Sequence, residues 1–144
     1  IAVNIRPAAI QLHGNEDKQY IESLKQQLEK EQLKTEIWQA IAVTDRLPDS
    51  WSNVDKIVLD TKNPDGSSGG SGQVFDWRVL NQINLDTPPV LLAGGINNDN
   101  ALDGLTYPVC GLDINSGVEN EKGVKSEQKI KTIFETINNR RISH

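Results

Sequence analysis

The chain has 144 residues, the length of one domain, and a net charge of −5 with acidic and basic residues mixed along it. It offers no basic stripe for nucleic acid, and no apolar run approaches the ~18 residues that span a membrane. No secretory signal is visible, and the single cysteine, Cys110, excludes an internal disulfide. We therefore expect a cytoplasmic protein that binds neither nucleic acid nor membrane.

The composition includes no methionine, and the sequence begins with Ile1. Because translation starts with Met, we expect that further sequence precedes Ile1 in the protein. Removal of the initiator Met is the alternative, although this removal usually requires a small second residue, which Ile1 is not.

Five short apolar runs predict β-strands, and segments of helical periodicity separate most of them. After the first run, Asn15 is placed to cap a helix through its side-chain oxygen. This helix carries Ile21, Leu24 and Leu28 at helical spacing, with lysines and glutamates on the opposite face. Only a turn, with at most a short helix, is expected at 47–51. The five expected strands are residues 8–13, 35–42, 56–60, 90–93 and 110–115.

The second half of the chain contains one long loop and three expected helices. The loop, at 61–74, is rich in Gly, Ser and Pro, and long loops in compact domains are usually functional or disordered. Asp76 is expected to cap a brief helix, and Ser126 a last helix at about 127–138. A short helix is also expected at 98–105.

Glycines follow each of the last three strands, in the loop at 69–72, at 94–95 and at Gly117. Strands joined by crossover helices pair in parallel, and right-handed crossovers bring their C-terminal ends to one side of the sheet. Ligands bind at that side in parallel α/β folds. The sequence therefore predicts an α/β fold with a ligand-binding rim like that of a βα-barrel enzyme.

Residue groups spread along the chain closely resemble the phosphoribosylanthranilate isomerase family. Each group is weak by itself, but their order and spacing match the family from about residue 8 to 137. The resemblance implies an α/β fold of the (βα)8 TIM-barrel family, with residues 1–144 forming a single domain that covers only the last five βα units. The groups are QLHG at 11–14, VLDT at 58–61, GGSG at 69–72, FDW at 75–77, LAGG at 92–95, GLDINSGVE at 111–119 and GVK at 123–125.

The resemblance implies an isomerase of tryptophan biosynthesis. Its reaction is an Amadori rearrangement of N-(5-phosphoribosyl)anthranilate to 1-(2-carboxyphenylamino)-1-deoxyribulose 5-phosphate. One proton is delivered to the ribose ring oxygen and another is removed from C2. In the family, the first strand carries a cysteine that acts as general base, and the second strand delivers an arginine to the substrate. Neither has a counterpart in this sequence, so we expect the general base on a strand that the sequence lacks.

By the same resemblance, Asp60 is the general acid. Alternation along the strand supports this role, because Lys56, Val58 and Asp60 share one side and Asp60 lies last, at the rim. A general acid must keep its proton near neutral pH, so its pKa has to be raised by burial or by a neighbouring anion. The alternative is an Asx turn, in which the carboxylate accepts from backbone N–H groups.

Two turns are expected to bind the substrate phosphate. Glycine permits close approach of backbone N–H groups to an anion, and barrels commonly place a phosphate after strands seven and eight. Tight βα turns that need glycine for a positive φ are the alternative. The expected phosphate-binding residues are Gly94, Gly95, Asn115, Ser116 and Gly117.

Four further residues are expected to bind substrate. Gly70 and Gly72 resemble the family's mobile loop, although flexible linkage explains these glycines equally well. His13 ends a strand at the same rim, and a hydrogen-bonded structural role is its alternative. Asp113 lies on the same side of its strand as Asn115 and is placed to accept from a substrate hydroxyl, but an inward carboxylate needs a partner in any case.

No metal site and no cofactor are expected, and Cys110 is expected to be a small buried hydrophobe. Two functional hypotheses follow. The first is the isomerase, acting on a small phosphorylated sugar and fused to or associated with indole-3-glycerol phosphate synthase, as in some bacteria. The second is an inactive barrel fragment that retains a phosphate-binding face and acts as a binding or assembly module, with unpaired edges that favour self-association.

Overall fold

Among the residues that the structure describes, five parallel strands form the main sheet, in the chain order β1-β2-β3-β4-β5. The structure is a computed structural model that describes residues 2–61 and 74–142. Each strand pairs in parallel with the next, so the predicted parallel α/β arrangement is confirmed. The strands are Ala9–Leu12, Glu36–Val43, Lys56–Thr61, Val90–Leu92 and Gly111–Leu112.

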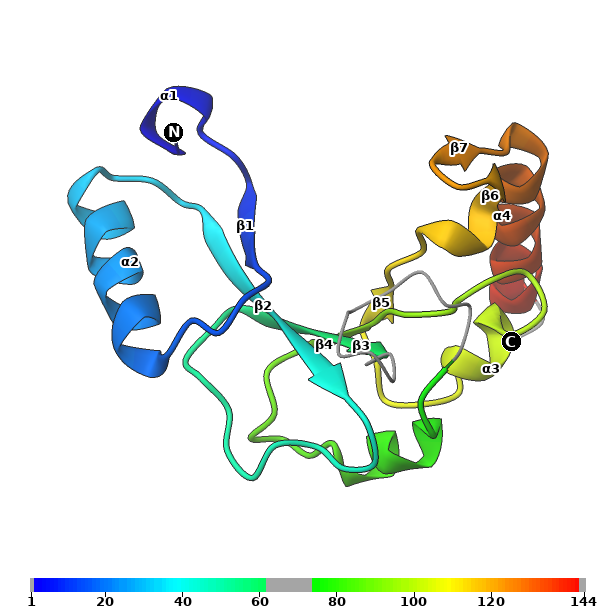
Figure 1. Ribbon diagram of the computed structural model, residues 1–144, viewed down its shortest axis with the longest axis horizontal. Helices are drawn as coiled ribbons and strands as arrows, with labels where there is room; N and C mark the ends of the chain where they lie inside the picture. Colours follow the sequence, from blue (N-terminus) through cyan, green and yellow to red (C-terminus); the bar gives the residue numbers. More distant parts are fainter. Residues whose placement is uncertain (1, 62–73, 143–144) are drawn as a thin grey trace.

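Helices follow β1, β3, β4 and β5 and lie on the outer side of the curved sheet (Figure 1). Between β2 and β3, residues 44–55 form turns without a helix. None of the helices in the described ranges has the length and apolar character needed to cross a membrane. The helices are α1 (Ala2–Ile5), α2 (Lys18–Lys30), the 3₁₀ helix η1 (Trp77–Gln82), α3 (Ala101–Gly104), the 3₁₀ helix η2 (Ser116–Val118) and α4 (Glu127–Ile142).

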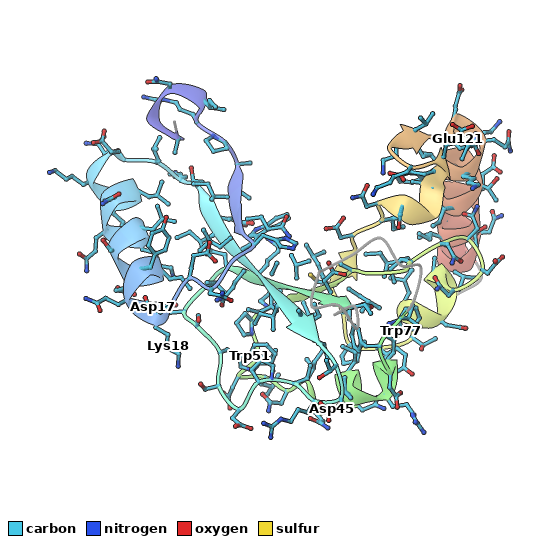
Figure 2. All side chains as sticks on the ribbon, viewed as in Figure 1. Asp17, Lys18, Asp45, Trp51, Trp77 and Glu121 are labelled. Atoms are coloured by element: carbon cyan, nitrogen blue, oxygen red, sulfur yellow. The ribbon has the colours of Figure 1, made fainter. Side chains whose placement is uncertain are left out.

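Asp17, not the predicted Asn15, caps helix α2. Its carboxylate accepts a hydrogen bond from Tyr20 N at 2.7 Å, and it lies at the first turn of the helix (Figure 2). The prediction was wrong because Gly14 N donates to the Glu16 carboxylate at 2.9 Å, which keeps this segment in a turn before the helix begins.

The two other predicted caps are confirmed. Asp76 caps η1 by accepting from Arg78 N at 3.0 Å. Ser126 Oγ accepts from Lys129 N at 3.3 Å at the start of α4. An antiparallel hairpin, which the sequence did not predict, precedes α4 and consists of β6 (Glu119–Glu121) and β7 (Val124–Lys125).

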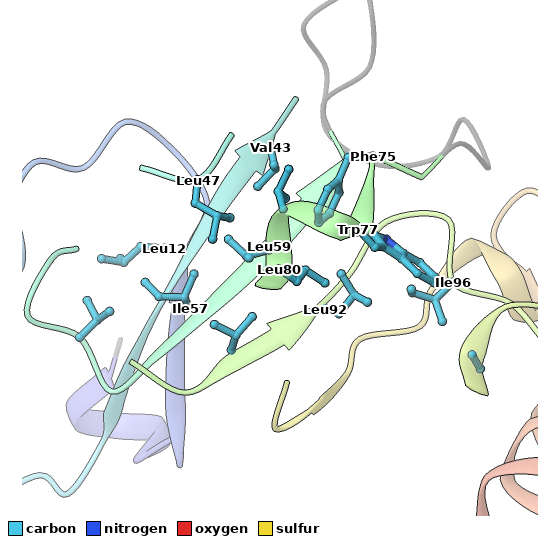
Figure 3. Close-up of a cluster of buried hydrophobic side chains, with 14 of the residues drawn as sticks. Leu12, Val43, Leu47, Ile57, Leu59, Phe75, Trp77, Leu80, Leu92 and Ile96 are labelled. Atoms are coloured by element: carbon cyan, nitrogen blue, oxygen red, sulfur yellow. The ribbon is translucent and has the colours of Figure 1, made fainter. Parts of the chain in front are cut away.

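The outer face of the sheet packs against the helices and forms the hydrophobic core. Ile57, Leu59, Leu80 and Leu92 are each 0% exposed, and they lie in a continuous band between β3, β4 and η1 (Figure 3). Full burial of each such side chain contributes about 1.5–3 kcal/mol. Because side chains alternate along a strand, this packing directs the intervening residues to the inner face of the sheet.

The inner face carries charged groups at both ends of β3. At the N-terminal end, Lys56 Nζ lies 2.5 Å from a Glu36 carboxylate oxygen and 4.9 Å from the centroid of the Trp38 ring. Val58 follows on the same face and is buried. Asp60 is the last inner-facing residue of the strand, so the predicted alternation places it at the rim.

Cys110 lies directly before β5 and is exposed, so the prediction of a small buried hydrophobe was wrong. Its N–H donates to Val90 O at 2.7 Å and continues the ladder with β4. The side chain is exposed because β5 is an outer strand of the five-stranded sheet and has a neighbouring strand on one side only among the described residues.

Candidate functional site

Asp60 is a buried carboxylate at the C-terminal end of β3. The residue is 9% exposed, and its Oδ1 accepts from Thr61 N at 2.7 Å. Burial raises the pKa of Asp60; the Thr61 N–H and the charge of His13 lower it in part, and the charge of Asp113 raises it. The net rise means that lost solvation outweighs the hydrogen bond. The carboxylate therefore accepts from a backbone N–H, although that of the next residue rather than the one two residues on as in an Asx turn, and it also has the raised pKa expected of a proton donor.

His13, Asp60 and Asp113 lie on the same face of the sheet. Backbone hydrogen bonds from Ala93 N to β3 and from Asp113 N to β4, both 2.8 Å, extend the parallel register beyond the strand ends. Alternation then places Asp60, Ala93 and Asp113 in one row, with the two carboxylates two strands apart, or roughly 10 Å at ~4.8 Å per strand. The side chains of His13 and Asp113 are exposed. The charges of both act on the pKa of Asp60, so the three side chains lie within range of each other's charges.

Gly94, just beyond β4, is held against the end of β3. Its φ is +78°, and that of Gly95 is +68°. A Cβ at position 94 would lie 2.5 Å from Thr61 N and closer still to Asp60 Oδ1. Both the positive φ and the lack of space therefore require glycine here. The loop after β4 consequently rests directly on the Asp60 carboxyl.

The loops after β4 and β5 touch each other through their backbones. A Cβ at Gly117 would overlap the carbonyl oxygen of Ile96 and lie 2.7 Å from its carbonyl carbon. Ser116 begins η2 and is partly exposed, and the first N–H groups of a helix have no acceptor inside it. The structure thus brings together the two turns that were predicted to bind phosphate, formed by Gly94, Gly95, Asn115, Ser116 and Gly117.

Asn100 fixes the turn after β4, and the sequence analysis missed this residue. Its Oδ1 accepts from Asn97 N at 2.8 Å, and its Nδ2 donates to Gly95 O at 3.0 Å. The signal was present in the run of Asn and Asp at 97–100, because these side chains commonly hydrogen-bond to nearby backbone groups in turns.

Gly70 and Gly72 lie outside the described residues. Next to that segment, Thr61 Oγ1 accepts from Phe75 N at 3.2 Å, and both residues are buried. This bond holds the end of β3 beside the start of η1, adjacent to Asp60. In the ranges that the structure describes, no group of three or more His, Cys, Asp or Glu side chains is arranged to hold a metal ion.

Comparison with known proteins identifies the family. The family model described as N-(5'phosphoribosyl)anthranilate (PRA) isomerase matches residues 1–136. "Tryptophan biosynthesis protein TrpCF" of Buchnera aphidicola subsp. Acyrthosiphon pisum (strain APS) is 42% identical over 138 residues, which are 95% of this chain and 28% of that protein. The TrpCF of Yersinia pestis is 41% identical over 131 residues, 90% of this chain and 26% of that protein. The chain thus spans little more than a quarter of these relatives.

Solved isomerase structures share the fold. Phosphoribosyl anthranilate isomerase from Thermus thermophilus matches with a TM-score of 0.78 at 26% identity, over 96% of this chain and 64% of that one. An isomerase in complex with reduced 1-(o-carboxyphenylamino)-1-deoxyribulose 5-phosphate matches with a TM-score of 0.70 at 21% identity, over 96% and 63% of the two chains, and shows the fold alone. From the family match over most of its length and the shared parallel sheet, this chain belongs to the phosphoribosylanthranilate isomerase family.

Proposed function

We propose that the chain forms part of an isomerase that converts N-(5-phosphoribosyl)anthranilate to 1-(2-carboxyphenylamino)-1-deoxyribulose 5-phosphate. The observation that carries the proposal is the buried Asp60 carboxyl, whose pKa is raised by burial and which lies against the glycine turn after β4. Opening of a ribose ring needs a proton donor that is still protonated near neutral pH, and this environment favours the protonated form.

Asp60 is the general acid in this proposal. The C1–O bond of the ribose breaks as the ring oxygen takes the Asp60 proton, and the lone pair of the anilino nitrogen forms a C1=N bond. Removal of a proton from C2 then gives an enolamine, which tautomerises to the aminoketose. Cys110 lies before β5, at the end of the sheet opposite to Asp60, so we assign the base that takes the C2 proton to a residue outside this sequence.

The two touching turns hold the substrate phosphate. Glycines at 94, 95 and 117 permit close approach of the backbone, and Ser116 and Gly117 present N–H groups at the start of η2. Asp113 accepts from a hydroxyl of the sugar, and His13 borders the substrate from β1. These roles are supported by the position of His13, Asp60 and Asp113 on one face of the sheet. They are also supported by the effect of the charges of His13 and Asp113 on the pKa of Asp60.

We further propose that residues 1–144 form one domain, an incomplete barrel that is fused to or associated with indole-3-glycerol phosphate synthase. The relatives named TrpCF extend far beyond the matched region, which supports a fusion. A second candidate function is binding or assembly without turnover. It is supported by β1 and β5, each of which pairs on one side only among the described residues and leaves an edge for another chain.

Turnover of N-(5-phosphoribosyl)anthranilate by the full-length protein tests the proposal. We expect turnover that depends on Asp60, together with competitive inhibition by inorganic phosphate. Phosphate binding without turnover would favour the binding module. Turnover that is unaffected by substitution of Asp60 would refute its assignment as the proton donor.

A further inference from the structure

Lys125, at the end of the β6–β7 hairpin, is bound to the turn that follows β5. Its Nζ donates to the backbone carbonyl oxygen of Asn115 at 2.8 Å and also to the side-chain Oδ1 of the same residue. A third bond, 2.7 Å long, goes to Glu119 Oε1. The three donors of this ammonium group are therefore all directed at Asn115 and Glu119.

The hairpin places Lys125 through several independent bonds. Glu119 pairs with Lys125 across the two strands, and Gly123 N donates to Glu119 Oε2 at 3.0 Å. Ser126 N donates to the carbonyl of the buried Val118 at 2.8 Å, which joins the hairpin to η2. Val118 and Ser126, which flank the hairpin and are bonded to each other, are both buried, so the base of the hairpin is fixed and with it the position of Lys125.

The bond to the Asn115 carbonyl constrains the direction of the next N–H group. In a planar trans peptide, the C=O of one residue and the N–H of the following residue point in opposite directions. Lys125 draws the Asn115 carbonyl toward the hairpin, so the Ser116 N–H points away from the hairpin. The backbone of Asn115 is irregular, with φ −118° and ψ −87°. Val118 N also donates to the Asn115 carbonyl within η2, at 3.4 Å, so the shorter bond from Lys125 adds to the helical bond in orienting this peptide.

We propose that Lys125 is a positioning residue for the phosphate site: it orients the Asn115–Ser116 peptide so that the Ser116 N–H faces the substrate phosphate. This inference rests on the proposed function, in which Ser116 binds that phosphate. The role of Lys125 is one of geometry rather than of long-range attraction, because Glu119 lies beside it and compensates its charge.

Lys122 provides a matched control on the same hairpin. It is exposed at the turn between β6 and β7, and its charge also acts on Glu119. Replacing either lysine by Met removes one positive charge from the hairpin, but only Lys125→Met removes the bonds to Asn115. A difference between the two variants therefore separates peptide orientation from simple loss of charge.

The experiment compares Lys125→Met, Lys125→Arg and Lys122→Met in the full-length protein. Steady-state kinetics with N-(5-phosphoribosyl)anthranilate give kcat and KM, and titration with inorganic phosphate, followed by amide NMR at 94–95 and 115–117, gives the affinity for the anion. For Lys125→Met we expect KM and the phosphate dissociation constant to rise about tenfold, the effect of losing a hydrogen bond to a charged group. We expect an unchanged kcat, partial recovery in Lys125→Arg, and parental values in Lys122→Met.

The results distinguish failure of the inference from failure of the proposed function. Parental phosphate affinity in Lys125→Met overturns the inference and leaves the proposed function standing. Equal losses in Lys125→Met and Lys122→Met overturn it as well, because charge alone then explains both. If the parent protein neither turns over the substrate nor binds phosphate at these amides, the proposed function is wrong and the inference fails with it.

Discussion

Gly94 lies so close to Asp60 that no side chain fits between the loop after β4 and the end of β3. A Cβ at position 94 would lie 2.5 Å from the backbone nitrogen of Thr61, and the Asp60 carboxylate is nearer still. The residue thus excludes solvent from one side of a carboxyl group whose pKa is raised chiefly by burial. The glycine after β4 therefore bears on the protonation of Asp60 as well as on the course of the loop.

Gly94→Ala is expected to lower both stability and turnover. The positive φ makes an L residue unfavourable by roughly 1–2 kcal/mol, and the new methyl group forces Asp60 or the loop to move. A displacement of about 1 Å at a reacting group can reduce the rate about 10²-fold. We expect a loss of this size in kcat, measured by steady-state kinetics, and a lower melting temperature.

Gly123→Ala separates the two causes of that loss. Gly123 has φ +83°, close to that of Gly94, but a Cβ there would meet nothing within 4 Å. This variant should show the loss in melting temperature that comes from backbone strain, with kcat unchanged. A normal kcat in Gly94→Ala would contradict the claim that Gly94 positions Asp60.

Asp60→Asn should abolish most of the turnover while leaving substrate binding nearly intact. Loss of a general acid typically costs roughly 10²–10⁴-fold in rate, and Asn keeps an oxygen that can accept from Thr61 N. We expect kcat to fall within this range with little change in KM. In the parent protein, kcat should also fall as pH rises through the raised pKa of Asp60, and this limb of the pH profile should be absent in the variant.

The same substitution should stabilise the fold at neutral pH. A carboxyl whose pKa is raised on folding binds its proton more tightly in the folded state, so the folded state loses stability as pH rises above the ordinary pKa of 3.8. Asp60→Asn removes this loss. Thermal melts should show a higher melting temperature than the parent at pH 7 and no gain below pH about 4. A lower melting temperature of the variant at pH 7 would show that the ionised carboxylate does not destabilise the folded state.

Local patterns in the sequence predict much of this fold, because helix capping and the alternation of side chains along a strand depend on residues that are close together in the chain. Asp76 and Ser126 were identified as caps from residue type and position, and the structure confirms both. Alternation along β3 placed Asp60 at the rim because one face of that strand, with Ile57 and Leu59, packs in the core. The resemblance of ordered motifs then indicated the family, which the family match confirms.

Features that depend on contacts which residue type and spacing do not reveal were not predicted. The exposure of Cys110 follows from the place of β5 at the edge of the sheet that the described residues form, which the residue's own apolar character does not reveal. The start of α2 at Lys18 depends on a hydrogen bond between Gly14 and Glu16, which competed with the expected cap. The bonds of Lys125 to Asn115 join residues ten positions apart and need the hairpin to form first, so no local pattern predicts them.

Asp76 should make the start of η1 sensitive to acid. The Arg78 side chain lowers the pKa of Asp76 from 3.8 to about 2, so the ionised form is favoured in the folded state. Its contribution to stability is present above pH about 4 and is lost as pH falls toward 2. Asp76→Ala should reduce the melting temperature at pH 7, and the difference from the parent should shrink over this pH window. Asp76→Asn retains the cap oxygen without the charge, so it should cost less at pH 7; equal losses in both variants would show that the ion pair and not the cap is responsible.

Gly117→Ala should separate the two turns of the proposed phosphate site. Its Cβ would overlap the Ile96 carbonyl oxygen and lie 3.0 Å from Asn97 Cα. These are backbone atoms, which cannot swing aside as a side chain can, so we expect the loops after β4 and β5 to move apart. KM should rise and inorganic phosphate should bind more weakly, both by about tenfold or more, since the backbone N–H groups no longer converge on the anion.

Gly14→Ala is the control, because its nearest neighbour at 3.0 Å is the flexible Glu16 carboxylate, and it should leave both constants unchanged. If Gly117→Ala binds phosphate as tightly as the parent, the contact between the two turns is not what forms the site.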